Sequence, residues 1–347
     1  MRIGSIRNWV VAVGAFGLIA GLLCGQTPKT GSGPSAELIR ADAAFKAGYA
    51  AVQAGKLDEA LGDFRTVVKL APQLAEGHLA LAATLMQLKR PGEAVPELEK
   101  ALKLKAVDSA GRDEIAENLA AAHEGVGRQL AAKGKLPEAE AEIRAAVEAC
   151  PSGLGAEAAS KAQLEDELGS VLAQETKWAE AEGAFRAAIG MLPAGSGGGS
   201  AGMHLHLGIA LVEQKRAAEG VDELKVAVAG LTGNPAGNAL AEFQLGRALA
   251  LAGRDEEAVP HFAEVLKLNP AFPQANLEMG MTVQRLGRQA DSIPWFEKAV
   301  EAEPRNVEAL TNLGLALTES GRRAPGIPSD ISLWRVIISA TTQQNTH

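Results

Sequence analysis

Aromatic residues are scarce in this chain: phenylalanine, tryptophan and tyrosine make up 4% of its 347 residues, and tyrosine occurs once. Because strands are enriched in aromatic side chains, this scarcity, together with abundant alanine, leucine, glutamate, glycine and lysine, favours helices over sheets. Hydrophobic residues still make up 47% of the chain, which is ample for a core. We therefore predict an all-α protein.

Positive charge is also in short supply. The chain has 34 lysine and arginine residues against 42 aspartate and glutamate residues, for a net charge of -8 at pH 7. A general nucleic-acid binder presents a basic stripe to the phosphates, and no such stripe is visible. The composition therefore excludes nucleic acid as the expected partner.

Cysteine is limited to Cys24 and Cys150. Cys24 falls at the end of an apolar N-terminal run, so a processed chain would keep only Cys150, which cannot form an internal disulfide. We expect Cys150 at a buried helix end.

The first 25 residues have the pattern of a targeting segment. Arg2 and Arg7 precede an uncharged apolar run over residues 9–23, as in a signal peptide. A membrane span takes about 20 residues, so the short run favours a cleaved signal over a retained anchor. We predict an exported chain, periplasmic or extracellular, with membrane anchoring by residues 9–24 as the alternative.

Cys24 adds a third possibility, because it stands where a bacterial lipoprotein carries its acylated cysteine. The lipobox that it resembles requires a small residue before the cysteine, and Leu23 stands there instead. The sequence leaves cleavage, retention and lipidation open. Residues 26–36, rich in glycine, proline and serine, are predicted to be a flexible linker.

From residue 41 onward the sequence repeats. The clearest unit, residues 41–74, places a small residue in a first helical segment and a large apolar residue in a second one. Such small-against-large pairing lets two helices pack closely. The small residues of the first segments are Gly48, Ala82, Gly127, Gly169, Gly208, Gly246, Gly280 and Gly314, and the large residues of the second segments are Phe64, Leu98, Ile143, Phe185, Leu224, Phe262 and Phe296.

This pattern closely resembles the tetratricopeptide repeat family, in its exported bacterial form. The resemblance implies an all-α, right-handed superhelical solenoid of antiparallel helix hairpins over residues 37–324, with about seven full repeats and a degenerate eighth. The repeats lie near residues 41–74, 75–108, 120–153, 162–195, 201–234, 239–272, 273–306 and 307–324.

The spacing between repeats varies, which places insertions at the joints near residues 109–119, 154–161, 195–200 and 233–238. We expect the first two to lengthen the helix that follows. The third is a run of glycine and serine, and it is either a surface loop or a flexible joint.

The eighth repeat lacks its second helix, because prolines interrupt the residues that follow the first. Residues 325–347 are therefore predicted to be a non-repeat tail. Ile331, Trp334 and Ile338 share one helical face and would suit a terminal cap. The alternative is an unrelated tail from a truncated or frame-shifted gene.

No pattern in the chain indicates catalysis. None of the six histidines is three or four residues from another, the spacing that places two metal ligands on one helix face. No phosphate-binding loop, dinucleotide fingerprint or nucleophile elbow is present. We predict no enzymatic activity, no cofactor and no metal.

Family resemblance also implies where a partner would bind, because the first helix of each tetratricopeptide hairpin lines a concave groove. The corresponding residues are Phe45, Tyr49, Leu79, Met86, Arg128, Phe243, Arg247, Met281 and Arg285, together with Gln53, Glu124, Leu205, Ile209 and Gln284. The arginines would serve partner carboxylates. A chaperone-type carboxylate clamp is absent, because Phe45, Tyr49 and Leu79 occupy its positions.

Taken as a whole, the sequence predicts a non-catalytic scaffold of the cell envelope that binds proteins or peptides in its groove. It touches a membrane only through an uncleaved N-terminal segment, and its oligomeric state is not determined by sequence. Two alternatives stay open: an accessory subunit of an envelope export or secretion assembly, and the recognition arm of a truncated enzyme.

Overall fold

The computed structural model describes residues 35–104, 109–151, 156–193, 199–270 and 272–320. Within these residues the structure consists of helices and connecting turns, with no strand. The predicted all-α fold class is therefore confirmed. The predictions for the signal or anchor, for most of the linker, for the glycine-rich joint at residues 194–198 and for the C-terminal tail fall outside the described residues.

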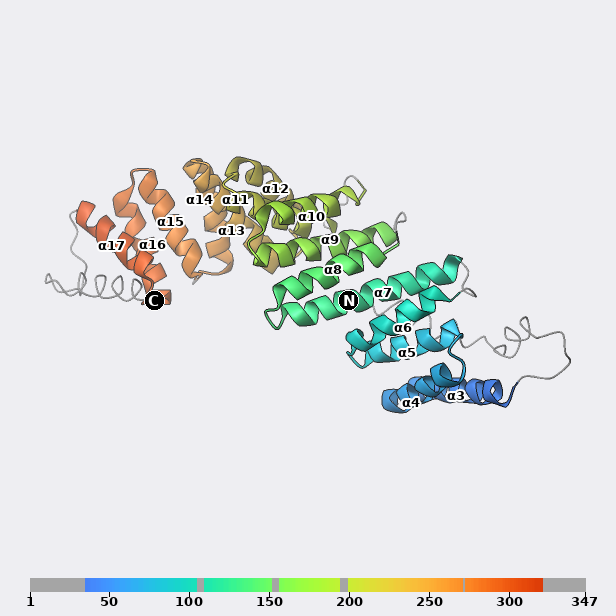
Figure 1. Cartoon of the computed structure of the whole chain (residues 1–347). Coiled ribbons are helices and arrows are strands. Elements are labelled where there is room, and N and C mark those ends of the chain that lie inside the picture. The colour runs from blue at the N-terminus through green and yellow to red at the C-terminus, as the bar shows by residue number, and fades with distance from the viewer. Residues whose placement is uncertain (1–34, 105–108, 152–155, 194–198, 271, 321–347) are drawn as a thin grey trace. The chain divides into compact units, whose positions relative to one another are not determined.

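The chain divides into two compact units, Met1–Glu175 and Thr176–His347, here called unit 1 and unit 2. The helices of unit 1 are α3 (Ala36–Gln53), α4 (Leu57–Leu70), α5 (Ala75–Gln87), α6 (Pro91–Lys103), α7 (Ser109–Ala131), α8 (Leu136–Ala149) and α9 (Ala156–Gln174) (Figure 1). Those of unit 2 are α10 (Trp178–Gly190), α11 (Ala201–Glu213), α12 (Ala217–Gly230), α13 (Pro235–Leu251), α14 (Asp255–Leu268), α15 (Pro273–Arg285), α16 (Gln289–Ala302) and α17 (Val307–Glu319).

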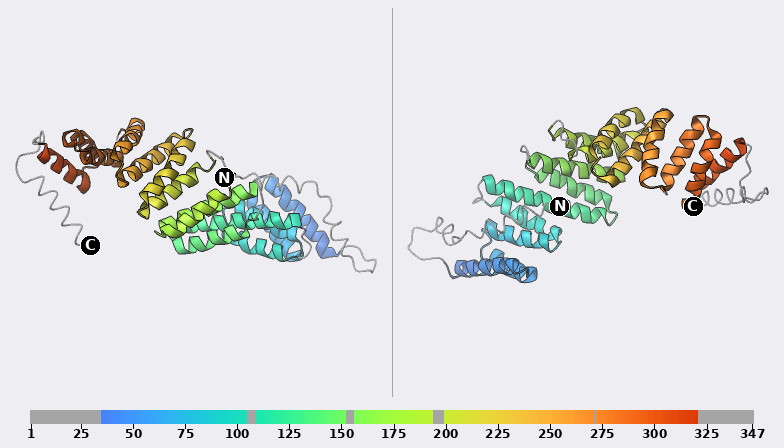
Figure 2. Two further views of the ribbon diagram at one scale, coloured as in Figure 1. Left: turned by 90° about the horizontal axis from the view of Figure 1, so that it is seen from above. Right: turned by 180° about the vertical axis from the view of Figure 1, so that it is seen from behind.

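Within each unit, consecutive helices pair as antiparallel hairpins (Figure 1, Figure 2). We call the odd-numbered helices first helices and the even-numbered ones second helices. First helices also approach the first helix of the next hairpin, as α5 does with α7, α11 with α13, and α15 with both α13 and α17. Within each unit the first helices therefore lie side by side, and we call the free side of these helices the inner face.

Each hairpin closes around a small residue, as the repeats predict. The large apolar residue follows sixteen positions later, as Phe296 follows Gly280. A Cβ added at Gly280 would lie 2.5 Å from the Phe296 ring, and one added at Gly208 would lie 2.6 Å from Leu224. Phe296 and Leu224 are completely buried. The glycines are thus required by close approach of the two helices.

A left-handed residue ends each first helix from α3 to α15, seven positions after the small residue. Four of these residues are glycines, with φ between 72° and 77°: Gly55, Gly134, Gly253 and Gly287. The other three are Lys89, Thr176 and Lys215, with φ between 59° and 64°. Side chains at such angles strain the backbone. The turn geometry is therefore conserved between repeats even where its preferred residue is missing.

The next turn is closed by an ion pair between a basic residue before the second helix and an acidic residue in its first turn. Arg90 and Glu93 lie 2.6 Å apart, Arg216 and Glu219 2.6 Å, and Arg254 and Glu257 2.7 Å. The carboxylates also lie near the positive end of the helix dipole, which favours them further.

Helix lengths record the insertions. The first two lengthen α7 to 23 residues and α9 to 19, as predicted. The fourth does the same for α13, which has 17 residues and begins at Pro235, where the Asn234 side chain accepts a hydrogen bond from Gly237 N. At the N-terminus, Ser35 accepts a hydrogen bond from Leu38 N and starts α3 at Ala36, inside the predicted linker.

Cys150 lies at the C-cap of α8 and is 5% exposed, which confirms the expected buried helix end. Burial raises the pKa of its thiol. A buried, protonated thiol is a poor nucleophile, so the structure gives Cys150 a packing role.

Candidate binding surface on the inner face

The inner face is defined by five positions on each first helix. Counted from the small residue they are -6, -3, +1, +4 and +5, which together span about 100° of the helix circumference. The groove residues named from the sequence all occupy these positions. The structure decides which of them reach solvent.

Apolar residues at the -3 position are buried. Phe45 is 6% exposed, Leu79 8% and Phe243 8%. Phe45 packs edge-on against Phe64, with ring centroids 5.6 Å apart, and Phe243 lies 5.3 Å from Phe272. These three residues hold the helices together and offer little surface to a partner. Tyr49, Met86 and Met281, at +1 or +4, are partly exposed.

Two of the three predicted arginines are already occupied by carboxylates of the chain itself. Arg128 on α7 donates to both oxygens of Glu167 on α9 at 2.7 and 2.6 Å, and pairs with Glu124 at 2.6 Å. Arg285 donates from Nε and Nη2 to Oδ1 of Asp255, at 2.9 and 2.7 Å. A partner carboxylate would therefore have to compete with a charge-assisted contact at each of these two arginines, and their role in binding stays a prediction.

Arg247 differs from both. Its guanidinium lies 3.9 Å from Glu213 on α11 and 3.7 Å from Glu278 on α15, and donates to Gln244 at 3.0 Å. It therefore bridges three neighbouring first helices loosely. These contacts also show that Arg247 lies beside residues of both neighbouring first helices, Glu213 at position +5 of α11 and Glu278 at position -2 of α15.

Exposed leucines mark the inner face of unit 2. Leu251 is 63% exposed, Leu240 45% and Leu315 44%. They occupy positions +5, -6 and +1, so each belongs to the same face as Arg247 and Met281. Sequence reasoning missed them. For Leu240 and Leu251 the available signal was leucine at positions -6 and +5, where most other repeats carry polar residues.

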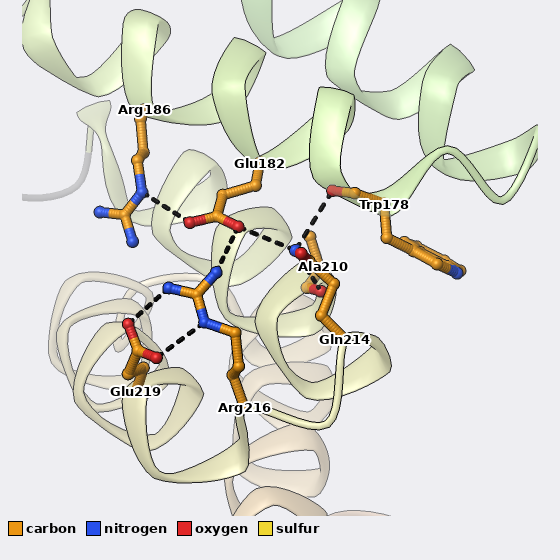
Figure 3. A network of polar contacts seen from close by, with 7 residues as sticks. All are labelled: Trp178, Glu182, Arg186, Ala210, Gln214, Arg216 and Glu219. Atoms are coloured by element: carbon orange, nitrogen blue, oxygen red, sulfur yellow. Dashed lines mark hydrogen bonds and ion pairs between the residues drawn. The ribbon is translucent and has the colours of Figure 1, made fainter.

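Polar contacts fix consecutive hairpins of unit 2 in register (Figure 3). Glu182 on α10 accepts hydrogen bonds from Arg186 at 3.0 Å, from Gln214 at 2.9 Å and from Arg216 at 2.6 Å. Burial would raise the pKa of Glu182, but the hydrogen bonds from Gln214 and Arg186 and the charge of Arg216 outweigh it and lower the pKa. The network is structural, because every member already has a partner.

Histidine–glutamate pairs recur inside the hairpins. His78 Nδ1 lies 2.6 Å from Glu97, His123 Nδ1 2.7 Å from Glu142, and His204 Nδ1 2.6 Å from Glu223. In a fourth hairpin the order is reversed, with Glu242 on the first helix and His261 on the second, again at 2.6 Å. The residues of each pair are nineteen positions apart, a spacing the sequence reading did not test. These histidines join the two helices of a hairpin.

Among the described residues, no group of three or more histidine, cysteine, aspartate or glutamate side chains is placed to hold a metal ion. None of the helices from α3 to α17 is both long enough and apolar enough to cross a membrane.

The fold and its inner face define a class, the all-α solenoids built from repeated helix hairpins. A family model described as tetratricopeptide repeat matches residues 45–110 and 167–237. These two regions therefore contain tetratricopeptide repeats. No curated protein matches it in sequence.

Several solved structures are similar to this chain at low identity. MamA from Desulfovibrio magneticus RS-1, residues 41 to the end, is 16% identical with a TM-score of 0.46, covering 54% of this chain and 96% of that one. A second crystal structure of MamA is 17% identical with a TM-score of 0.43, covering 52% and 97%. YrrB, described as a tetratricopeptide protein with an unusual peptide-binding site, is 18% identical with a TM-score of 0.34, covering 72% and 96%.

Proposed function

We propose that this protein is a non-catalytic scaffold of the cell envelope that holds a peptide or protein segment on the inner face of unit 2. The observation that carries the proposal is the group of exposed leucines. Three of the six large hydrophobic residues that are exposed in the described part of the chain, Leu240, Leu251 and Leu315, occupy inner-face positions of this unit.

Exposed leucines gain free energy when a partner covers them. A contiguous apolar patch rimmed by polar groups is typical of an interaction site. Here the exposed leucines share the inner face of unit 2 with Met281, whose thioether adapts well to different partners, and with the charged residues Arg247 and Glu213. Burying the leucines under a partner would recover the hydrophobic free energy that folding leaves unused.

A role in the envelope is supported by the N-terminal residues. Arg2, Arg7 and the apolar run over residues 9–23 match an export signal. Cell fractionation followed by mass spectrometry of the mature N-terminus tests this part. A chain recovered in the cytoplasm with residues 1–25 intact would contradict it.

Site-specific photo-crosslinking tests the binding surface. A photoreactive residue replaces Leu251, and in a matched variant it replaces Val226 on α12, which is 46% exposed and lies on a second helix. We expect a discrete crosslinked partner from position 251 and none from position 226. Equal crosslinking at both positions would contradict a specific inner-face site.

A second variant separates binding from folding. Leu240→Gln with Leu251→Gln removes the exposed leucines while keeping good helix formers, and exposed substitutions of this kind change stability by about 0.5 kcal/mol or less. We expect unchanged helicity and loss of the crosslink when the photoreactive group is placed at Leu315. A crosslink that persists would place the partner elsewhere.

A further inference from the structure

Charge on the inner face of unit 2 is unevenly matched. Arg285 is committed to Asp255, and Arg247 is shared at long range between Glu213 and Glu278. Glu308 and Glu319, at inner-face positions of α17, have no ion pair among the described residues. The positive charges of this surface are thus used, while several carboxylates are not.

Glu278 is the most constrained of these carboxylates. Its side chain is 23% exposed, and its nearest cation is Arg247 at 3.7 Å. Burial raises the pKa of Glu278, which Arg247 and Arg285 oppose and which the negative charge of Glu308 reinforces. A carboxylate in that position gains free energy from any further cation placed beside it.

Unit 1 does not offer the same surface. At the equivalent place, Arg128 makes three contacts of 2.6 to 2.7 Å with Glu124 and Glu167, so each of these carboxylates has a close ion pair. In the described part of unit 1, the large hydrophobic residue that is exposed is Ile39, in the first turn of α3 and outside the five positions. Unpaired acid and exposed leucine coincide on the inner face of unit 2.

We propose that the segment bound there is amphipathic and basic, with a lysine or arginine that sits between Glu278 and Glu308 and apolar side chains that cover the exposed leucines. The proposal rests on the function proposed above and adds the chemistry of the partner. An acidic segment would meet Arg247 only by displacing it from Glu278, and would then face Glu278 and Glu308 directly. Like charges brought together in an interface are strongly unfavourable.

Two labelled peptides of equal length test the charge preference against the whole chain. Both carry the same leucines, one with lysines and the other with glutamates at the remaining charged positions, and binding is followed by fluorescence anisotropy. We expect the lysine peptide to bind at least about tenfold more tightly at low salt. Because the ion pairs are partly solvated, the difference should shrink as salt rises.

Charge-neutral variants locate the effect. In Glu278→Gln with Glu308→Gln the difference between the peptides should fall to about threefold or less. The matched control is Glu297→Gln with Glu301→Gln on α16, which removes the same charge from exposed residues of a second helix in the same unit. The control should keep the full difference.

The results distinguish the two proposals. Equal affinity for both peptides, tighter binding of the glutamate peptide, or a difference that survives in the Glu278 and Glu308 variant overturns the basic partner. If binding is nevertheless lost in the Leu240 and Leu251 variant, the proposed function stands without it. If neither peptide binds, or if that leucine variant binds both as well as the wild type does, the inner-face site itself is overturned.

Discussion

Single residues in this protein show how far a repeat tolerates the wrong side chain. The first helices from α3 to α15 end on a left-handed residue, and three hairpins place lysine or threonine there instead of glycine. A left-handed conformation costs an L-residue roughly 1–2 kcal/mol. The turns form nonetheless, because buried pairs of a small and a large residue, such as Ala82 and Leu98, hold the helices on either side.

Replacing Lys89 or Lys215 by glycine should therefore stabilise the protein. We expect about 0.5–1 kcal/mol for each, since relief of strain exceeds the added freedom of the unfolded chain. Denaturant unfolding of the single variants measures this change in the free energy of unfolding. Gly253→Ala, at the equivalent turn with φ 73°, is the reciprocal control and should destabilise by about 1 kcal/mol. A Lys89→Gly or Lys215→Gly variant that is less stable than the wild type would contradict backbone strain at these turns.

At the scale of elements, each hairpin depends on the distance between its two helices. That distance is set by a residue without a side chain on the first helix and a large one on the second, as with Gly246 and Phe262, where an added Cβ would lie 2.7 Å from the ring. The histidine–glutamate pairs then join the same helices by polar contact. Both features bring together residues from different helices of one hairpin.

Glycine substitutions should change stability with opposite sign at two helical sites. Gly280→Ala places a methyl group 2.5 Å from the buried Phe296 ring, and should cost about 1–3 kcal/mol. Gly62→Ala, in α4 with nothing within 4 Å, should gain about 0.5–1 kcal/mol from helix propensity. Thermal unfolding of both variants measures the sign and size of each stability change. The same sign at both sites would contradict the packing described.

For the whole molecule, stability should be local rather than shared. Every hairpin contacts only its neighbours, so a solenoid behaves as a sum of repeats and interfaces. The chain further divides into two compact units at Glu175. A partner bound to unit 2 would therefore stabilise that unit in particular.

Hydrogen exchange tests this locality. Phe64→Ala empties a 3% exposed site between α3 and α4, and should cost about 3–5 kcal/mol locally. We expect faster amide exchange in α3 to α6 and unchanged protection in α13 to α16. Uniform loss of protection along the chain would show that the units unfold together.

Much of the fold follows from the sequence alone. The recurrence of Gly48 with Phe64, and of its six counterparts, determines a helix hairpin, because a small residue and a large one at that spacing meet when two helices fold back on each other. Proline after the second helix and an acidic first turn set the boundaries. All of these signals lie within about 34 residues, so tertiary structure is not needed to read them.

Tertiary structure decided which inner-face residues reach solvent. Phe45 and Phe243 lie on the same face of their first helices as Leu240 and Leu251 do, but only the two phenylalanines are buried by neighbouring helices. Likewise Arg128 and Arg247 occupy the same repeat position, and Glu167 engages the first closely while Glu278 stays 3.7 Å from the second. Exposure and pairing depend on side chains a full repeat away, whose distance is fixed only when the hairpins pack.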